Sequence, residues 1–435
     1  MAKWQDIYQA RLTTAEEAVK VIKSGDRVVP GHGGSESELL VGEMVKRYKE
    51  LENVRIVQAV TFGSSPYAKP EMKGHFVINS FFLGPNTRSS VWNHYGDLIP
   101  IHFHEFPRAF REGWVPIDVF LTIVSPPDKY GYCSLGVSVD HSKQLVESAK
   151  IVIAEVNPNM PRTYGDTLVH VSQFDYIIEN DSPLLELQRF GEQDEVTDSI
   201  GKNIASLIDD GDTLQMGTGK IPNALLGYLR EKNDLGIHTE LFSDGLIELI
   251  ELGVVTGKKK TLWPNKVVAT FIQGTKLVYD YVHENPIFQL MPVEYVNNPC
   301  VIAQNDNMVA INQALEIDLL GQVVSEAIGT KQYSGIGGQL DYLTGAAMSR
   351  NGKPILVLPS TAKNGTVSRI TCQIKPGTPV TDTRNDVHYV VTEYGVANLF
   401  AKTNEERARA LINIAHPNFR EELKAQYKEL FGRTL

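Results

Sequence analysis

Short apolar runs alternate along the chain with longer segments in which apolar residues recur every three or four positions. Four of the short runs are rich in β-branched residues, as is typical of buried strands: residues 27–29, 54–60, 119–124 and 150–156. The segments between them have the spacing of amphipathic helices. The alternation predicts an α/β protein with buried sheets.

The chain opens with a helix signal. Thr13 and Glu16 have the spacing of a capping box, and an apolar stripe at Ala18, Val19 and Ile22 follows them. The N-terminal stretch lacks the uninterrupted apolar core of a signal peptide, and no segment approaches the roughly 18 apolar residues that span a bilayer. We therefore expect an amphipathic first helix and a cytoplasmic protein.

The order of elements repeats across a polar segment at residues 181–198. Residues 22–44 and residues 208–229 both contain a helix end, a Gly-Asp pair, a short strand, a glycine-rich turn and a new apolar helix. The Gly-Asp pairs begin at Gly25 and Gly211. A match of this kind at a constant offset indicates a duplicated structural unit.

A second pair of matching turns lies further along each half. Asp128 precedes Gly131 by three residues, and Asp318 precedes Gly321 by three residues. Both pairs of matches are offset by about 190 residues. We therefore predict two tandem α/β domains of one fold, residues 1–185 and residues 195–435.

Composition narrows the class of partner. The 435-residue chain is 42% hydrophobic and has a formal net charge of -10, which argues against nucleic acid or an anionic membrane as the main partner. Its three cysteines lie far apart without metal-ligand spacing, which suits a reducing compartment: Cys133, Cys300 and Cys372. An anionic ligand would therefore have to be bound by local donors.

Two glycine-rich segments are candidates for ligand binding. Residues 216–226 place Gly217 and Gly219 between a strand and a helix, where free N–H groups and the helix dipole favour an anion. The spacing matches neither the dinucleotide fingerprint nor a P-loop, so a simple tight turn is an equal alternative. Residues 333–349 bring three glycines close together, which indicates close approach of either another segment or a ligand.

A lone acid, Glu240, stands between a strand end and the start of an apolar-striped helix. Ser243 or Asp244 can cap that helix, so Glu240 is free for another role. From the residues alone, a solvated or ion-paired glutamate is the commoner case than a catalytic one. A second polar loop, bearing Lys363 and Arg369, follows the strand at residues 353–360, at the sheet edge where ligands of α/β proteins bind.

Other candidate chemistry is weaker. His102 and His104 are expected on one face of a strand, with Glu105 on the other, but no third ligand stands at a useful spacing, so we predict no metal site. The hydrolase motif Gly-x-Ser-x-Gly is absent, and the cysteines lack a local activating partner. The lysines at residues 258–260 are expected to form a solvated turn.

Several segments together resemble the acetyl-CoA hydrolase/transferase family of CoA-transferases, over essentially the whole chain. The sequence looks closest to the 4-hydroxybutyrate CoA-transferases within that family. The combination of segments is specific, whereas no single glycine motif is. The segments that carry the resemblance are residues 123–128, 154–157, 164–172, 328–339, 389–397 and 407–417.

The resemblance assigns roles to individual residues. It implies that Glu240 is the nucleophile, and that Asn297 and the backbone N–H of Gly338 stabilise the oxyanion. Relatives usually have a small residue where Lys220 stands, so this lysine would either pair with a phosphate of coenzyme A or crowd the acyl pocket. The residues expected to border coenzyme A are Gly217, Thr218, Gly219, Lys220, Ile221, Gly337 and Lys363.

The implied reaction moves coenzyme A from a short-chain acyl-CoA to a short carboxylic acid through a glutamyl-CoA thioester. The active site would lie between the two domains, with residues 31–38 and 61–66 facing the acyl group. Coenzyme A is a substrate in this scheme, and no metal or tightly bound cofactor is needed. A glutamate with an ordinary pKa near 4.3 is ionised at neutral pH and needs no general base. Relatives imply a homodimer or a dimer of dimers.

Two alternatives remain open from the sequence. An acyl-CoA hydrolase would use the same glutamate but let water attack the acyl group or the thioester. A non-catalytic sensor would bind coenzyme A without turnover.

Overall fold

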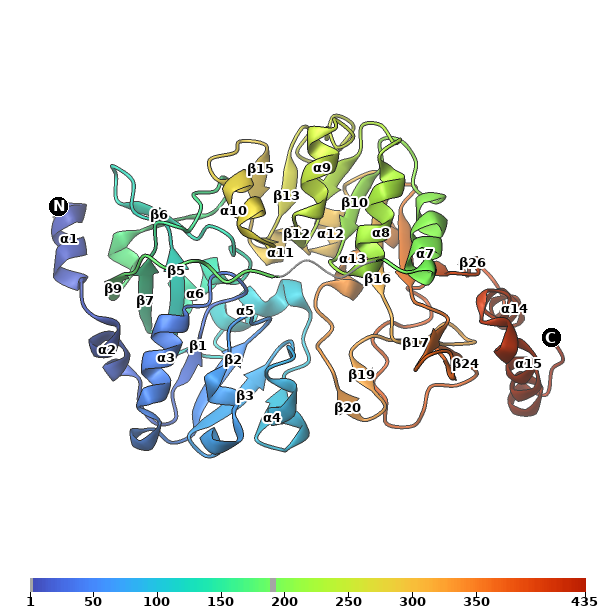
Figure 1. The fold of residues 1–435 in the computed structure, drawn as a ribbon, viewed down its shortest axis with the longest axis horizontal. Helices are drawn as coiled ribbons and strands as arrows, with labels where there is room; N and C mark the ends of the chain where they lie inside the picture. The colour runs from blue at the N-terminus through green and yellow to red at the C-terminus, as the bar shows by residue number, and fades with distance from the viewer. Residues whose placement is uncertain (1–2, 188–192) are drawn as a thin grey trace.

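Two β-sheets form the centre of the molecule, and helices cover them (Figure 1). The computed structural model describes residues 3–187 and 193–435. The first sheet is wholly parallel, in the order β4-β3-β2-β1-β5-β7-β9. Its strands are β1 (Arg27–Val29), β2 (Val54–Gln58), β3 (Phe76–Ser80), β4 (Gly96–Leu98), β5 (Val119–Val124), β7 (Ile151–Val156) and β9 (Tyr176–Glu179). All four apolar runs identified in the sequence are therefore confirmed as neighbouring strands of one buried sheet.

The second sheet has the order β15-β13-β11-β10-β16-β21-β25-β26, with only the edge strand β26 antiparallel. Its strands are β10 (Thr213–Met216), β11 (Gly236–His238), β13 (Val267–Ala269), β15 (Phe288–Leu290), β16 (Met308–Gln313), β21 (Lys353–Val357), β25 (Tyr389–Thr392) and β26 (Gly395–Asn398). In both sheets the first strand is central, the next three follow on one side and the later ones on the other. This shared topology confirms the predicted duplication.

The matching turns have the same geometry in both halves. Gly25 and Gly211 have φ angles of 84° and 86°. The carboxylates of Asp26 and Asp212 each accept a hydrogen bond of 2.8 Å from the backbone N–H three residues earlier. A positive φ costs little conformational energy only in glycine, so the Gly-Asp pair identifies this turn in the sequence. The position of the boundary at residues 185–195 stays a prediction, and residues 188–192 lie outside the described part.

Helices and short ribbons complete the two domains. The helices are α1 (Trp4–Arg11), α2 (Ala15–Ala18), α3 (Glu38–Lys46), α4 (Arg88–Trp92), α5 (Phe106–Arg111), α6 (Ser142–Ser148), α7 (Glu195–Ala205), α8 (Lys220–Leu229), α9 (Gly245–Glu251), α10 (Lys276–Val282), α11 (Val293–Val296), α12 (Pro299–Ile302), α13 (Gln339–Met348), α14 (Asn404–Ile414) and α15 (Pro417–Phe431). The short strands are β6 (Tyr132–Ser134), β8 (Leu168–His170), β12 (Leu241–Phe242), β14 (Phe271–Ile272), β17 (Glu316–Asp318), β18 (Val323–Val324), β19 (Ala327–Ile328), β20 (Lys331–Gln332), β22 (Thr361–Ala362), β23 (Val367–Ser368) and β24 (Ile370–Thr371). The two ends of the chain lie at opposite ends of the molecule (Figure 1). None of the described helices is both long and apolar enough to cross a membrane.

The first helix signal was placed one residue too early. Thr14, not Thr13, caps α2, and its hydroxyl accepts a hydrogen bond from the backbone N–H of Glu17. A separate helix, α1, precedes it. The error has a simple cause, because either of two adjacent threonines supplies a capping hydroxyl at nearly the same spacing.

The two domains are joined by main-chain hydrogen bonds as well as by a shared apolar core. Three of these bonds connect β14 and the residue before it to the loop before α6: Ile272 of β14 donates to Val137, and Val139 and Asp140 both donate to Thr270. Gly165 is held on both sides by Leu290 of β15, since Leu290 donates to Tyr164 and Asp166 donates to Leu290. The largest apolar cluster contains residues of both sheets, Phe120 and Ile311 among them. The carboxyl ends of the two sets of strands are thereby held close together.

Replacing Gly165 with alanine should destabilise this junction. The φ angle of Gly165 is 119°, and a Cβ there would lie 2.0 Å from the carbonyl oxygen of Leu290. We expect Gly165→Ala to lower the free energy of unfolding by more than about 2 kcal/mol, measured by urea denaturation. Gly42 is the matched control, because nothing lies within 4 Å of its added Cβ in α3. Gly42→Ala should leave stability unchanged or raise it by up to about 1 kcal/mol. Equal effects at the two positions would contradict the close approach at Gly165.

Candidate active site

Glu240 lies where β11 leads into β12, at the carboxyl edge of the second sheet. Its backbone carbonyl accepts hydrogen bonds from the N–H groups of Thr270 and Phe271, at 3.0 and 3.2 Å. Its side-chain Oε2 accepts a hydrogen bond of 2.7 Å from Nδ2 of Asn297. Asn297 is fully buried and directly follows the short helix α11. Both the backbone and the carboxylate of Glu240 are therefore held in place.

Gly338 packs against the same carboxylate. A Cβ at this position would lie 1.9 Å from Oε2 of Glu240 and 2.3 Å from Nδ2 of Asn297, so any side chain would displace one of them. Gly338 is also the N-cap of α13, without a side-chain cap. The positive end of a helix favours an anion beside it. The structure thus brings the three predicted catalytic residues together, and their chemical roles stay predictions.

The other glycines of this loop accommodate the first domain. A Cβ at Gly335 would lie 2.1 Å from the backbone oxygen of Phe81, and one at Gly337, where φ is 57°, would lie 3.3 Å from the ring of Phe82. Phe81 and Phe82 directly follow β3 of the first sheet. Of the two alternatives open from the sequence, close approach of another segment is the one seen at Gly335 and Gly337.

The glycine-rich turn after β10 lines a small cavity next to that loop. The cavity measures 200 Å³, and Gly217, Gly335 and Gln339 are among its lining residues. Gly219 has a φ angle of 139° and stands at the N-cap of α8, where a side chain would contact Nε2 of Gln313 at 3.2 Å. Thr218 instead lines a separate, larger hollow, and Ile221 is buried in the core.

The two predicted lysines lie apart from the carboxylate. The ammonium of Lys220 lies 4.0 Å from Oδ2 of Asp194, and both side chains are about half exposed. Lys220 is therefore at the surface, between the starts of α7 and α8. Lys363 lies in the exposed hairpin loop between β22 and β23, and within the described residues no contact joins it to Glu240. Roles for these lysines in binding coenzyme A stay predictions.

Burial raises the pKa of Glu240 to about 7. The Asn297 hydrogen bond opposes this shift, while the negative charges of Asp341 and Asp140 add to it and His32 lowers the pKa. An ordinary pKa was expected from the sequence, so that expectation does not hold for the free protein. Near neutral pH the carboxyl group is only about half ionised.

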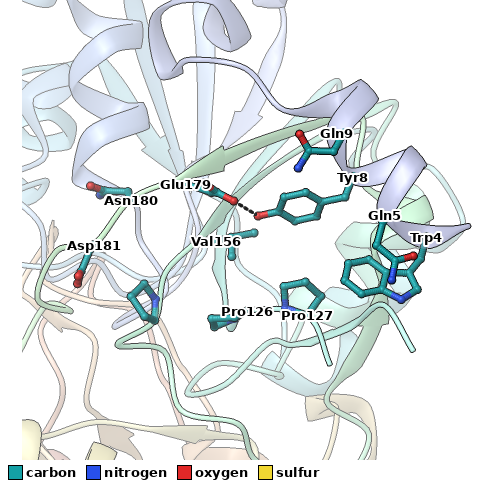
Figure 2. A pocket seen from close by; sticks show the side chains of 11 residues that line it. Trp4, Gln5, Tyr8, Gln9, Pro126, Pro127, Val156, Glu179, Asn180 and Asp181 are labelled. Carbon is teal, nitrogen blue, oxygen red and sulfur yellow. Dashed lines mark hydrogen bonds between the residues drawn. The ribbon is translucent and has the colours of Figure 1, made fainter. Parts of the chain in front are cut away.

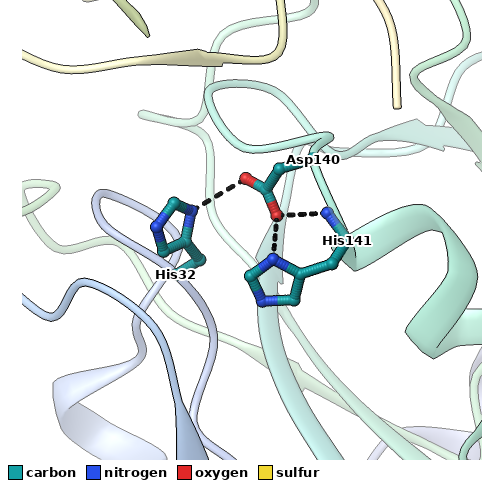
Figure 3. A group of neighbouring side chains, drawn as sticks. All are labelled: His32, Asp140 and His141. Atoms are coloured by element: carbon teal, nitrogen blue, oxygen red, sulfur yellow. Dashed lines mark hydrogen bonds and ion pairs between the residues drawn. The ribbon is translucent and has the colours of Figure 1, made fainter. Parts of the chain in front are cut away.

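His32, Asp140 and His141 form a buried cluster in the first domain (Figure 3). The charges of His32 and Asp140 act on Glu240. Asp140 Oδ2 is 2.8 Å from Nδ1 of His32, and Asp140 Oδ1 is 2.9 Å from Nδ1 of His141. Ser138 donates a further hydrogen bond to Asp140. These are residue types that bind metals, but here both Asp140 oxygens already accept hydrogen bonds from protein groups. Burial lowers the pKa of His141, and the two imidazoles keep that of Asp140 well below its usual range.

The prediction for His102 and His104 was wrong in its secondary structure. They flank and occupy a 3₁₀ turn, η5 (Phe103–Glu105), rather than a strand. Sequence reasoning also missed a third residue, Asp341 on α13, whose Oδ1 lies 2.8 Å from Nδ1 of His104 and 3.4 Å from Nδ1 of His102. The backbone N–H of His104 donates to the other oxygen of Asp341 at 3.2 Å. No local signal could have shown this, because the partners lie in different domains.

Two further local predictions were wrong. Asp244 stands at the N-cap of α9, but its carboxylate accepts hydrogen bonds from the N–H and hydroxyl of Thr275 instead of capping the helix. Lys260 is only 4% exposed rather than solvated, and its ammonium donates to the carbonyls of Ile237 and Lys266. Burial lowers the pKa of Lys260 to about 7. In both cases a tertiary partner replaces the local interaction that the sequence favours.

A further cavity lies in the first domain (Figure 2). It measures 530 Å³ and is lined by α1 and by the turns after β5, β7 and β9. Tyr8 donates a 2.8 Å hydrogen bond to Glu179 at its wall. None of its lining residues contacts the Glu240 carboxylate in the described structure, so it is separate from the candidate active site.

Two family models match the chain. The acetyl-CoA hydrolase/transferase N-terminal domain matches residues 2–186, and the acetyl-CoA hydrolase/transferase C-terminal domain matches residues 274–427. Together they cover well over half of the sequence. The second match contains Asn297 and Gly338 but begins after Glu240.

Full-length relatives agree with the family models. The chain is 52% identical to 4-hydroxybutyrate coenzyme A transferase of Clostridium kluyveri, over 99% of this chain and 100% of that one. The crystal structure of RipA from Yersinia pestis matches with a TM-score of 0.93 and 39% identity, over 99% of this chain and 100% of that one. A 4-hydroxybutyrate CoA-transferase structure from Porphyromonas gingivalis has a TM-score of 0.84 and 43% identity, over 98% and 99% of the two chains. The chain therefore belongs to the acetyl-CoA hydrolase/transferase family, as an enzyme of the CoA-transferase type.

Proposed function

We propose that the enzyme transfers coenzyme A from a short-chain acyl-CoA, such as acetyl-CoA or butyryl-CoA, to a short carboxylic acid, such as 4-hydroxybutyrate, through a glutamyl-CoA thioester on Glu240. The observation that carries the proposal is the partly buried carboxylate of Glu240, contacted on one oxygen by the Asn297 amide and by Gly338. The relatives from C. kluyveri and P. gingivalis are 4-hydroxybutyrate CoA-transferases, which favours 4-hydroxybutyrate as the acid.

The first half-reaction makes and consumes a mixed anhydride. A carboxylate oxygen of Glu240 attacks the thioester carbonyl, the carbon–sulfur bond breaks, and coenzyme A leaves as its thiolate. The thiolate then attacks the side-chain carbonyl of Glu240 and expels the first acid as a carboxylate. What remains on the enzyme is a glutamyl-CoA thioester.

The second half-reaction runs the same steps in reverse. The incoming carboxylate attacks the glutamyl thioester, and the thiolate leaves and then attacks the acyl carbonyl of the new anhydride. This restores the carboxylate of Glu240 and releases the new acyl-CoA. One thioester replaces another, so the exchange requires neither ATP nor a metal, and coenzyme A is a substrate rather than a resident cofactor.

Each addition step creates an oxyanion, for which the Asn297 amide and the Gly338 N–H are the proposed donors. Removing one such donor in other enzymes costs about 3 to 4 kcal/mol of transition-state stabilisation. The side chain of Asn297 is fully buried, so its dipole would act in surroundings of low polarity.

The acyl group is proposed to face the first domain. The turns at residues 31–38 and 61–66 lie side by side, because Gly33 pairs with Thr61. His32 in the first of these turns lies 4.8 Å, ring centre to ring centre, from Phe271, whose N–H binds the Glu240 carbonyl. The proposal places this assembly in a homodimer or dimer of dimers in the cytoplasm.

Incubation with acetyl-CoA or butyryl-CoA without an acceptor acid should attach coenzyme A to Glu240. After quenching and digestion, mass spectrometry should find the adduct on the peptide that contains Glu240, and addition of acetate or 4-hydroxybutyrate should remove it. Glu240→Ala is the control and should give no adduct.

Other outcomes of this experiment separate the alternatives. Release of free coenzyme A without an adduct or an acceptor would indicate an acyl-CoA hydrolase. Binding of coenzyme A with neither adduct nor turnover would indicate a sensor. Transfer activity that survives in Glu240→Ala would rule out the proposed nucleophile.

Adding a single methyl group at Gly338 should abolish transfer. Its carbon would overlap Oε2 of Glu240 and Nδ2 of Asn297. We expect Gly338→Ala to reduce kcat at least about a hundredfold, because misplacing the reacting groups lowers the reaction rate by about this factor. Gly227→Ala in α8, where nothing lies within 4 Å of the new carbon, is the control and should keep full activity. Wild-type turnover in Gly338→Ala would exclude the proposed arrangement.

Activity should depend on the ionisation of Glu240. Since burial raises its pKa to about 7, kcat/KM should fall about tenfold per pH unit as the pH decreases below that value. The charge of Asp341 raises this pKa, so Asp341→Asn should move the decline to lower pH. Asp280→Asn, at an exposed acid of α10, should leave the profile in place. If kcat/KM declines at the same pH in Asp341→Asn as in the wild type, a group other than Glu240 titrates.

A further inference from the structure

His238 is a buried residue near the active site for which the proposed mechanism has no use. It is the last residue of β11, two positions before Glu240, and is fully buried. Its Nε2 lies 2.8 Å from the backbone oxygen of Val296. A carbonyl oxygen can only accept, so Nε2 carries a proton and donates it.

The surroundings of His238 favour a neutral imidazole. Burial lowers the pKa of His238 to about 3, and the nearby charge of Lys260 adds to the shift. Its other nitrogen, Nδ1, is buried and has no hydrogen-bond partner in the described part of the chain. The ring therefore stays in the Nε2–H form, which suits a structural donor and not a general acid or base.

The carbonyl that His238 binds ends a short helix. Val296 is the last residue of α11, where carbonyl groups lack partners within the helix. A second donor, the buried hydroxyl of Tyr342, lies 3.3 Å from the same oxygen. Tyr342 is on α13, the helix that begins after Gly338. Donors from the two segments that carry Glu240 and Gly338 thus meet on the Val296 carbonyl.

This carbonyl belongs to the peptide unit that leads into Asn297. A peptide unit is planar, so holding its oxygen also holds the direction in which the chain enters Asn297. Within the described residues the Asn297 side chain makes a single hydrogen bond: Nδ2 donates to Glu240, while Oδ1 is buried and has no partner. The orientation of the amide therefore depends on the main chain behind it.

We propose that His238 is a positioning residue that, by donating its Nε2–H to the Val296 carbonyl, directs the Asn297 amide onto Glu240. The inference rests on the proposed function, because it treats the contact between Asn297 and Glu240 as part of the reaction. It explains why a histidine two residues before the nucleophile serves this site without touching it.

A pair of substitutions at His238 tests the inference. The amide nitrogen of glutamine can reach the place of Nε2, whereas that of asparagine reaches only the place of Nδ1. His238→Asn should therefore lower kcat roughly tenfold to a hundredfold, with little change in the KM for acyl-CoA, and His238→Gln should recover most of the loss. In the Asn297→Ala background, His238→Asn should add less than about a threefold further loss, because the effect passes through Asn297.

A pH profile gives an independent readout. The Asn297 hydrogen bond lowers the pKa of Glu240, so a misdirected amide should move the acid decline of kcat/KM to higher pH in both His238→Asn and Asn297→Ala. His238→Gln should keep the wild-type profile. A general loss of folding would produce no such shift.

Several outcomes overturn the inference. Equal activity of the asparagine and glutamine variants, or full additivity with Asn297→Ala, would show that His238 does not act through Asn297. If His238→Asn does not fold, Tyr342→Phe removes the second donor to the same carbonyl and should shift kcat and the profile in the same direction, and no shift would count against the inference. Absence of the glutamyl-CoA adduct in the wild-type enzyme would remove the proposed function itself, and the inference with it.

Discussion

The contact of Gly338 and Asn297 with one oxygen of Glu240 is the constraint on which the site depends. A carboxylate taken out of water loses hydration, and here a single amide hydrogen bond and the start of a helix replace part of it. The hydration that these groups do not replace leaves the charged form of Glu240 disfavoured, which raises its pKa to about 7. Because the contact with Gly338 is too close for any Cβ, a side chain at this position would displace Glu240 or Asn297.

Much of the surrounding electrostatics comes from the first domain. His32 and Asp140 act on Glu240 directly, and His104 binds Asp341 at the start of α13. The main-chain bonds between β14 and the loop before α6 hold these groups at a constant distance. Neither domain alone contains the full set of charges that determines the pKa of Glu240.

Local patterns in the sequence were sufficient for four neighbouring strands of the first sheet, the repeated Gly-Asp turn and the position of Glu240 at a strand end. They failed where a tertiary partner overrides a local preference, as Thr275 does for Asp244 and as two buried carbonyls do for Lys260. The alternating residues around His102 and His104 have the pattern of a strand, although prolines lie close on both sides, at Pro100 and Pro107. The proposed role of Glu240 as the nucleophile came from the family resemblance. The links of Asp341 to His104 and of His238 to Val296 join distant segments, so no local pattern contains them.

The shared topology of the two sheets has an evolutionary consequence. In the first sheet β2 holds the place that β11 holds in the second, so the turn after β2 corresponds to the turn that carries Glu240. Residues 59–65, which form the turn after β2, contain no acidic residue, so under the proposed function only one copy of the duplicated turn carries the reactive acid. The other copy was then free to change without loss of chemistry. Descendants of such a duplication can vary one half to accept new acids while the other half conserves the reaction.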